Sequence, residues 1–221
     1  MSGILALVGG GEWSEGCSFD RGLLEASGGT EVVVLATGSA YENPDKLVVR
    51  ATEWFEGLGA TVREAKVYTR PDAVLAADAE LIRDAKFIYL AGASAMHLRS
   101  VLKDSPTFDA ICAAYRGGAV LAGTNAGADV LCDPMVDSRG GAFTVGLGVV
   151  SNLAVIPRAN TWSHDKIHRT VELAAKGLSL AAVPEATALI RSADGLWRSE
   201  GVGDVSIWVD GKASTIADLR S

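Results

Sequence analysis

The feature that most constrains the fold of this chain is the alternation, through its first half, of short apolar segments with amphipathic ones. Residues 45–57 and 72–84 have apolar side chains at helical spacing, which predicts a helix in each segment. Strands that alternate with helices build a parallel sheet covered by helices on both faces. The strands that we predict in this half are Ile4–Val8, Glu31–Ala36, Thr61–Lys66, Phe87–Leu90 and Ala119–Ala122.

The pattern changes after about residue 178, where short apolar runs are separated by Gly and Asp turns. The runs are Leu180–Val183, Thr187–Arg191, Gly195–Arg198 and Val205–Val209, and they predict antiparallel strands. No linker or low-complexity tract interrupts the chain, so we expect these strands to extend the same sheet. The predicted fold is one α/β domain over residues 1–221, a three-layer αβα sandwich around a mostly parallel sheet with an antiparallel extension.

Composition and charge exclude several classes of function. The net charge of -7 argues against a surface for nucleic acid, which needs clustered Lys and Arg. The apolar run at the start of the chain is too short for a membrane span and lacks the basic flank of a signal peptide. Three widely separated cysteines, Cys17, Cys112 and Cys132, lack the paired spacing of a zinc or redox site. We therefore expect a cytoplasmic protein that contacts neither nucleic acid nor membrane.

One segment, Gly118–Asp129, suggests chemistry. It joins a buried strand to a small-residue helix through a turn in which Gly123, Asn125 and Gly127 have the spacing of a nucleophile elbow. Such an elbow places its central residue at the sharp turn between strand and helix. Turns of α/β proteins also use glycine for steric reasons alone, so the spacing by itself is weak evidence.

The residues around the turn make the evidence stronger. Leu121–Ala128 closely resembles the I-x-G-T-S-A-G-A block of the cyanophycinase and aspartyl dipeptidase (dipeptidase E-like) family of serine peptidases, with Asn125 where that block has serine. Further blocks resemble the family in the same order along most of the chain: Val8–Glu12, Phe55–Ala60, Asp84–Gly92, Gly146–Gly148 and Val183–Leu189. The resemblance implies the class I glutamine amidotransferase-like fold, which is also described as flavodoxin-like.

The chain departs from the family at the residues that perform catalysis. The resemblance implies a triad of serine, histidine and an acid, and it aligns these positions with Asn125, Trp162 and Glu185. In the same alignment, Lys166 and His168 stand where the family's histidine block has two arginines. A carboxamide does not attack a carbonyl as a serine hydroxyl does, and an indole has no basic nitrogen to accept a proton. We therefore expect no intact catalytic residue.

A modified pocket is expected to remain around these three positions. Asparagine suits a strained elbow because it tolerates positive φ. The residues expected to line the pocket are Gly10, Gly11, Gly92, Ala93, Ser94, Thr124, Ala126, Asn160 and His164.

Other candidate sites have simpler explanations. His164 and His168 lie four residues apart, as some zinc ligands do, but no third ligand accompanies them, and exposed helix residues are the better interpretation. The triple glycine at residues 9–11 lacks the spacing of a dinucleotide-binding loop. We expect neither a metal nor a cofactor.

Three functions are consistent with the sequence. The first is a family member that has lost hydrolysis and binds a small molecule or a short acidic peptide. The second is an active hydrolase of aspartyl peptides, with His164 as a displaced base and Thr124 or Ser94 in place of the lost hydroxyl. The third is a non-catalytic subunit of a hetero-oligomer. A homodimer is a further expected assembly, and the sequence does not rank the first and third functions.

Overall fold

A central sheet of seven strands organises the chain. The computed structural model describes residues 2–219, and its sheet has the order β13-β12-β1-β5-β4-β2-β3. Strands β1, β5, β4, β2 and β3 run parallel, and β12 and β13 add an antiparallel edge beside β1. This confirms the predicted mostly parallel sheet with an antiparallel extension. The strands are β1 (Leu5–Val8), β2 (Glu31–Gly38), β3 (Thr61–Glu64), β4 (Phe87–Gly92), β5 (Val120–Thr124), β12 (Thr187–Arg191) and β13 (Trp197–Gly201).

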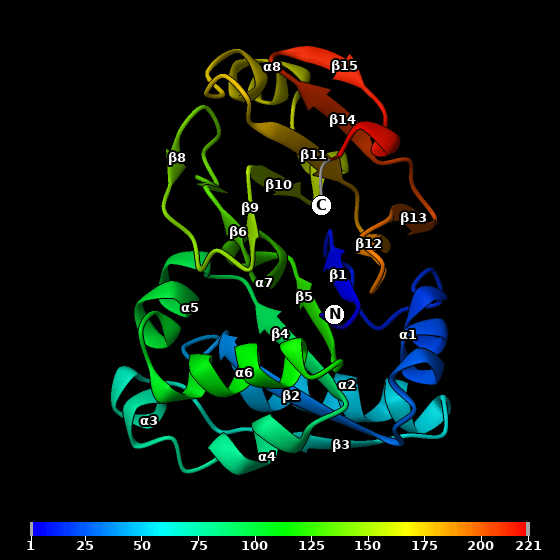
Figure 1. Cartoon of the computed structure of the whole chain (residues 1–221), viewed down its shortest axis with the longest axis vertical. Coiled ribbons are helices and arrows are strands. Elements are labelled where there is room, and N and C mark those ends of the chain that lie inside the picture. Colours follow the sequence, from blue (N-terminus) through cyan, green and yellow to red (C-terminus); the bar gives the residue numbers. More distant parts are fainter. Residues whose placement is uncertain (1, 220–221) are drawn as a thin grey trace.

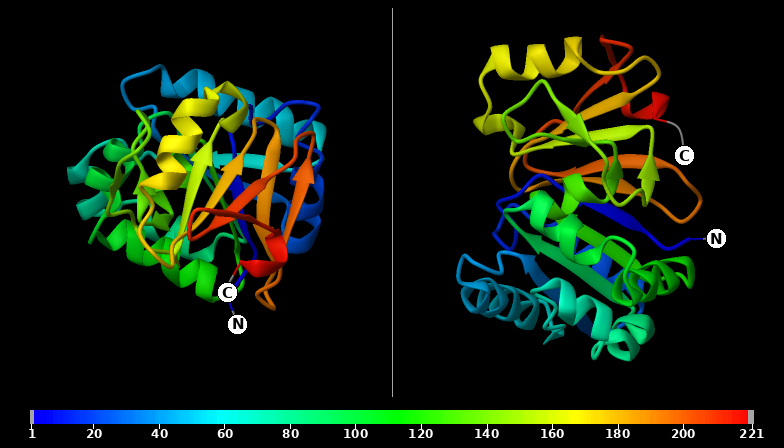
Figure 2. Two further views of the ribbon diagram at one scale, coloured as in Figure 1. Left: turned by 90° about the horizontal axis from the view of Figure 1, so that it is seen from above. Right: turned by 90° about the vertical axis from the view of Figure 1, so that its left-hand side faces the viewer.

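Helices cover both faces of this sheet (Figures 1 and 2). Alternate residues of β2 show why, since Val33 and Leu35 enter one core and Val32 and Val34 enter the other. Helices α1 (Phe19–Ser27) and α2 (Pro44–Gly57) supply Leu23 and Phe55 to the second core. The opposite face is covered by α3 (Arg70–Leu75), α4 (Ala79–Asp84), α5 (Ala95–Leu102) and α6 (Pro106–Arg116).

The predicted helix over residues 72–84 is wrong in one respect, because the segment forms two short helices. Helix α3 begins with a capping box between Thr69 and Asp72 and ends at Ala76, which has a left-handed φ of 50°. Asp78, the N-cap residue of α4, accepts a hydrogen bond at 2.8 Å from the backbone N–H of Lys66. This contact fixes the break between the two helices.

The expectation that all late strands extend the central sheet is also wrong, because four strands form a second sheet. Its order is β10-β11-β14-β15, and it comprises β10 (Leu153–Pro157), β11 (Ser179–Val183), β14 (Ser206–Val209) and β15 (Lys212–Ser214). Strand β11 is buried on both faces. Its Ala181 and Val183 belong to the core that α3, α4, α5 and α6 cover, and its Leu180 and Ala182 belong to a separate core under α8 (His164–Glu172). Because β11 contributes side chains to two different cores, it lies between these cores and does not extend the central sheet.

Two short strand pairs connect these layers. Strand β6 (Cys132–Asp133) pairs with β9 (Val150–Ser151), and β7 (Met135–Val136) pairs with β8 (Phe143–Thr144). The β7–β8 hairpin lies on the same side of the molecule as α5 and α8 (Figure 1). Among residues 2–219, the helices are all too short or too polar to cross a membrane.

Candidate functional site

Asn125 occupies a sharp turn between β5 and the short helix α7 (Ala126–Val130). Its backbone has φ 52° and ψ -113°, a strained conformation, and its N–H donates to the carbonyl of Val8 at 2.9 Å. Strand β5 lies between β1 and β4 at the centre of the sheet. The prediction that Asn125 follows a central parallel strand and begins a helix is therefore confirmed.

The two glycines of the turn are needed because backbones approach closely there. A Cβ added to Gly127 would lie 2.2 Å from the carbonyl oxygen of Leu90, and one added to Gly123 would lie 2.5 Å from the carbonyl carbon of Gly127. Neither position has room for a side chain. The glycine spacing in the sequence thus reflects the packing of α7 against β4 and β5.

A cavity of about 480 Å³ opens beside Asn125. Its walls come from the start of α5, from α7, from the β7–β8 hairpin, from the end of β10 and from the first turn of α8. The lining residues are Ala93, Ser94, Ala95, Met96, Asn125, Ala126, Asp129, Met135, Val136, Asp137, Ser138, Thr144, Pro157, Arg158, Thr161, Trp162 and Lys166. A cavity of this size suits a small molecule or the end of a peptide.

Glu185, which the sequence resemblance aligns with the family's acid, is held by two side chains. Arg158 Nε donates to its Oε1 at 2.9 Å, and Asn160 Nδ2 donates to its Oε2 at 3.1 Å. The Asn160 Oδ1 accepts the backbone N–H of Glu185 at 2.8 Å, which completes a reciprocal pair. The hydrogen bond from Asn160, followed by that from Arg158, lowers the pKa of Glu185. Glu185 is therefore an ionised carboxylate whose partner is a guanidinium.

Trp162, which the sequence resemblance aligns with the family's base, lines the cavity together with Asn125, and its side chain packs against the core that contains Val171 of α8. The Lys166 ammonium, one helical turn further on, lies over the indole with Nζ 3.4 Å from the ring centroid. Partial burial, with the nearby positive charge of Arg169, lowers the pKa of Lys166. The Lys166 ammonium thus shares the cavity with Asn125, where the resemblance leads us to expect an imidazole in relatives.

The two hydroxyls proposed as replacement nucleophiles lie in different settings. Thr124 is fully buried, and its Oγ1 donates to Glu12 Oε2 at 2.9 Å. Ser94 lines the cavity, and its Oγ accepts the backbone N–H of His97 at 3.2 Å as the N-cap of α5. The His97 Nε2 donates to the carbonyl of Tyr68 at 2.8 Å. No imidazole in the described part of the chain is hydrogen-bonded to either hydroxyl.

The three glycines expected in the pocket are not among the residues that line the cavity, but they lie close to residues around it. A Cβ on Gly10 would lie 2.9 Å from Cγ of Arg158 and 3.7 Å from Cβ of Asn125, and one on Gly11 would lie 3.1 Å from Cβ of Glu185. Gly92, with φ 128°, packs against the backbone of β2 just before Ala93. These positions let the loops approach the three triad positions closely.

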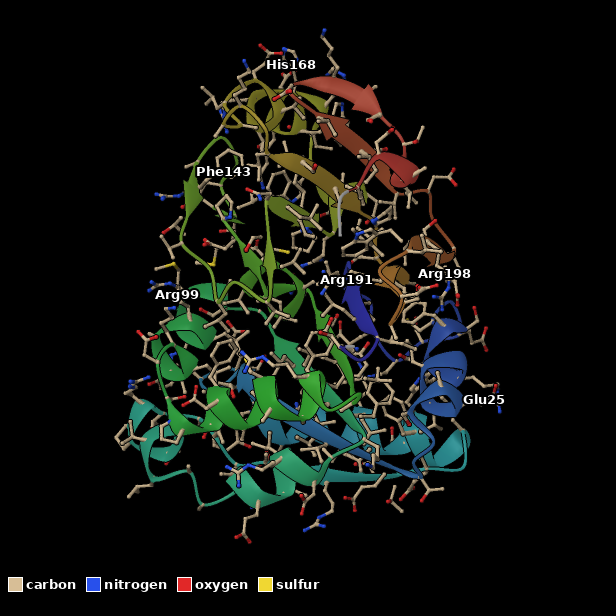
Figure 3. All side chains as sticks on the ribbon, in the orientation of Figure 1. Glu25, Arg99, Phe143, His168, Arg191 and Arg198 are labelled. Atoms are coloured by element: carbon tan, nitrogen blue, oxygen red, sulfur yellow. The ribbon has the colours of Figure 1, made fainter. Side chains whose placement is uncertain are left out.

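His164 is not brought to the cavity. Its side chain is 94% exposed, and its ring stacks on that of His168 with the centroids 6.2 Å apart. Figure 3 places His168 at the outer surface of the molecule on α8. Within residues 2–219, no cluster of three or more His, Cys, Asp or Glu side chains could hold a metal ion.

Sequence reasoning missed three charged groups of the cavity: Arg158, Asp129 and Asp137. The only sequence signals were their positions, since Asp129 comes one helical turn after Asn125 and Arg158 comes two residues before Asn160. Asp129 is buried, and burial raises the pKa of its carboxyl well above the usual range. Asp137 is paired with Arg139, whose hydrogen bonds lower the pKa of Asp137 to about 2.

Comparison with known proteins gives the same architecture. The family model described as "Peptidase family S51" matches residues 5–196, a range that includes Asn125, Trp162 and Glu185. The crystal structure of a peptidase from an acI-B1 Actinobacterium is similar, with a TM-score of 0.86 and 26% identity over 97% of this chain and 93% of that one. A putative peptidase E protein from Listeria monocytogenes EGD-e shares the fold, with a TM-score of 0.67 and 18% identity over 92% of this chain and 100% of that one. No curated protein sequence gives a significant match.

Proposed function

We propose, from the premise that this chain belongs to peptidase family S51, that it has lost serine-peptidase activity and binds the acidic end of a small molecule or short peptide. In this proposal Asn125 stands in place of the catalytic serine and Trp162 in place of the histidine. The cavity then serves recognition instead of hydrolysis.

One observation is the main support for the loss of hydrolysis: the strained elbow presents a carboxamide to a cavity whose described lining includes no histidine. Acyl transfer needs a nucleophile and a base within hydrogen-bond reach of each other. Glu185, which would orient such a base, is bonded instead to Arg158 and Asn160. Glu185 and Trp162 thus have cationic partners, Arg158 and Lys166, that suit the binding of an anion.

The alternative of a displaced triad receives less support from the contacts of its hydroxyls. Thr124 is buried, and its hydroxyl donates a hydrogen bond to the Glu12 carboxylate. Ser94 faces the cavity, but the nearest histidine in sequence, His97, uses its Nε2 for the Tyr68 carbonyl. Neither hydroxyl is hydrogen-bonded to an imidazole in the described part of the chain, and Thr124, whose partner is the Glu12 carboxylate, does not line the cavity.

The charges of the cavity favour an anionic occupant. Arg158 and Lys166 both line it, while Asp137 is already paired with Arg139. Lys166 has no carboxylate within salt-bridge distance among residues 2–219. An unpaired ammonium and a guanidinium are the groups that bind a carboxylate. We therefore propose a ligand with at least one carboxylate, such as a peptide that bears an acidic residue.

Calorimetric titration and a hydrolysis assay test this proposal on the same protein. We expect N-acetyl-L-aspartate or the dipeptide Asp-Leu to bind, and we expect no hydrolysis of Asp-Leu and no labelling by a serine-directed phosphonate. The double variant Asn125→Ser with Trp162→His, which restores both nucleophile and base, serves as the control for reagent access. Stoichiometric labelling of the wild type that maps to Ser94 or Thr124 would contradict the proposal and favour the displaced triad.

The cytosol is the proposed site of action. All three cysteines are free thiols, and Cys17 and Cys132 are buried among apolar side chains. A reducing compartment is where unpaired cysteines persist.

A further inference from the structure

Asp129 is a buried acid that the family resemblance does not account for. It lies on α7 one turn after Asn125, and its side chain lines the same cavity although only 5% of the residue is exposed. One carboxyl oxygen, Oδ1, accepts the backbone N–H of Val136 at 2.8 Å. The second oxygen, Oδ2, has no hydrogen-bond partner within residues 2–219.

The Val136 contact fixes the orientation of the carboxyl group. Val136 belongs to β7, so the bond ties the base of the β7–β8 hairpin to α7. An oxygen that accepts an N–H does not carry the proton of a carboxylic acid at the same lone pair. A proton on Asp129 is therefore expected on Oδ2, the oxygen that remains free for a cavity occupant.

The electrostatic surroundings of Asp129 favour its neutral form. Burial is the largest cause of its raised pKa, and the negative charge of Asp137 on the hairpin adds to it. No Lys, Arg or His side chain of the described chain lies within salt-bridge distance. The other titratable groups on the elements packed around α7 are Cys132 and Asp133 on β6, Tyr89 on β4, and His97 and Arg99 on α5, with Arg158 and Lys166 on the cavity wall.

We propose that Asp129 is a ligand-binding residue whose carboxylic acid donates a hydrogen bond from Oδ2 to a carbonyl or carboxylate oxygen of the occupant. This inference rests on the proposed function and restricts the class of ligand that we propose for the cavity. Arg158 and Lys166 take one carboxylate, and Asp129 takes a second acceptor group. The preferred occupant is then an acylated acidic residue or a dicarboxylate, and a ligand with one carboxylate and no second acceptor binds less tightly.

Two substitutions at Asp129 separate hydrogen bonding from shape. Asp129→Asn keeps an acceptor for Val136 and a donor toward the cavity, and it does not titrate. Asp129→Leu has the same branched shape, with bulkier ends, but neither group. With N-acetyl-L-aspartate as the probe at pH 6, we expect Asp129→Asn to retain wild-type affinity within about twofold and Asp129→Leu to lose roughly tenfold, the worth of a hydrogen bond to a charged group.

The pH dependence gives a second readout. The donor is present below the pKa of Asp129 in the folded protein and is lost as pH rises through that pKa, while both carboxyls of the probe stay ionised above pH 6. We expect binding to wild type to weaken toward pH 9 by more than binding to Asp129→Asn. A decrease in affinity of the same size in both proteins would be caused by deprotonation of Lys166, whose pKa is lowered.

Failure of the inference and failure of the proposed function give different results. Equal affinity of wild type and Asp129→Leu, with both folded by circular dichroism, would overturn the role of Asp129 and leave the proposed function intact. If wild type binds neither N-acetyl-L-aspartate nor succinate, the proposed ligand class fails. Carbon-13 NMR of the Asp129 carboxyl in the free protein tests the inference without a ligand, and an ionised carboxylate at pH 6 would overturn it.

Discussion

The Lys166 ammonium lies over the face of the Trp162 indole, with Nζ 3.4 Å from the ring centroid. An ammonium over an aromatic face is held by the electrostatic attraction of the ring. Both side chains line the cavity that contains Asn125, so the contact fixes a positive charge close to the elbow. Trp162 therefore positions a cation in the cavity.

Removing that cation should weaken the binding of acidic ligands. We expect Lys166→Met to lower the affinity for N-acetyl-L-aspartate about tenfold, because a charge-assisted hydrogen bond is lost while the aliphatic stem is kept. Calorimetry at low and high salt measures the effect. Lys176→Met is the matched control, since Lys176 is exposed and does not line the cavity. Equal losses in the two variants would show that only the net charge of the protein matters.

Restoring the triad side chains should restore little activity. The double variant Asn125→Ser with Trp162→His is expected to hydrolyse Asp-Leu feebly, and each single variant almost not at all, because nucleophile and base act as a unit. Glu185 would still be bonded to Arg158 and Asn160 and not to the new imidazole. A single variant as active as the double would show that Trp162 does not occupy the base position.

Asp20 should make the stability of the protein depend on pH. It lies buried in the first turn of α1, its Oδ2 accepts a hydrogen bond from Nε1 of Trp54 on α2 at 3.0 Å, and burial raises its pKa from 3.8 to about 8. The folded state therefore binds this proton more tightly than the unfolded state does. The stabilisation is fully present below about pH 4 and is lost as pH rises toward 8.

Asp20→Asn removes this titration. We expect the melting temperature of wild type to fall relative to that of the variant between pH 5 and pH 8, with a difference in free energy of at most about 1.4 kcal/mol for each pH unit. Scanning calorimetry of both proteins at the two pH values measures it. Parallel curves would show that Asp20 is already ionised in the folded protein at pH 5.

Gly127→Ala should destabilise the elbow. The new Cβ would lie 2.2 Å from the carbonyl oxygen of Leu90, so α7 must move away from β4, at a cost of roughly 1–3 kcal/mol. Gly22→Ala on α1 is the control, because a Cβ there meets nothing within 4 Å and alanine favours a helix by about 0.5–1 kcal/mol. Urea unfolding of the two variants should give changes of opposite sign. Destabilisation of similar size in both would contradict the packing argument.

The sequence determined the central sheet and the elbow because both depend on local patterns. Alternating apolar strands and amphipathic helices specify a parallel sheet, and the spacing of Gly123 and Gly127 around Asn125 specifies a sharp turn. The same local reasoning failed at Ala76, where the helix breaks and Asp78 accepts a hydrogen bond from the backbone of Lys66, in the loop after β3. It also failed for β11, whose burial on two faces appears only once both cores exist.

The tertiary structure alone decided which charges meet at the site. The sequence indicated Asn125, Trp162 and Glu185, but it gave no sign that Arg158 would bond to Glu185 or that Asp129 would be buried in the same cavity. Hydrogen bonds and burial depend on residues that are distant in sequence and become neighbours only when the sheets and loops pack. Desolvation and the field of neighbouring charges then set whether each group is ionised. The sequence specifies which side chains are present, whereas their protonation states and their hydrogen-bond partners depend on the fold.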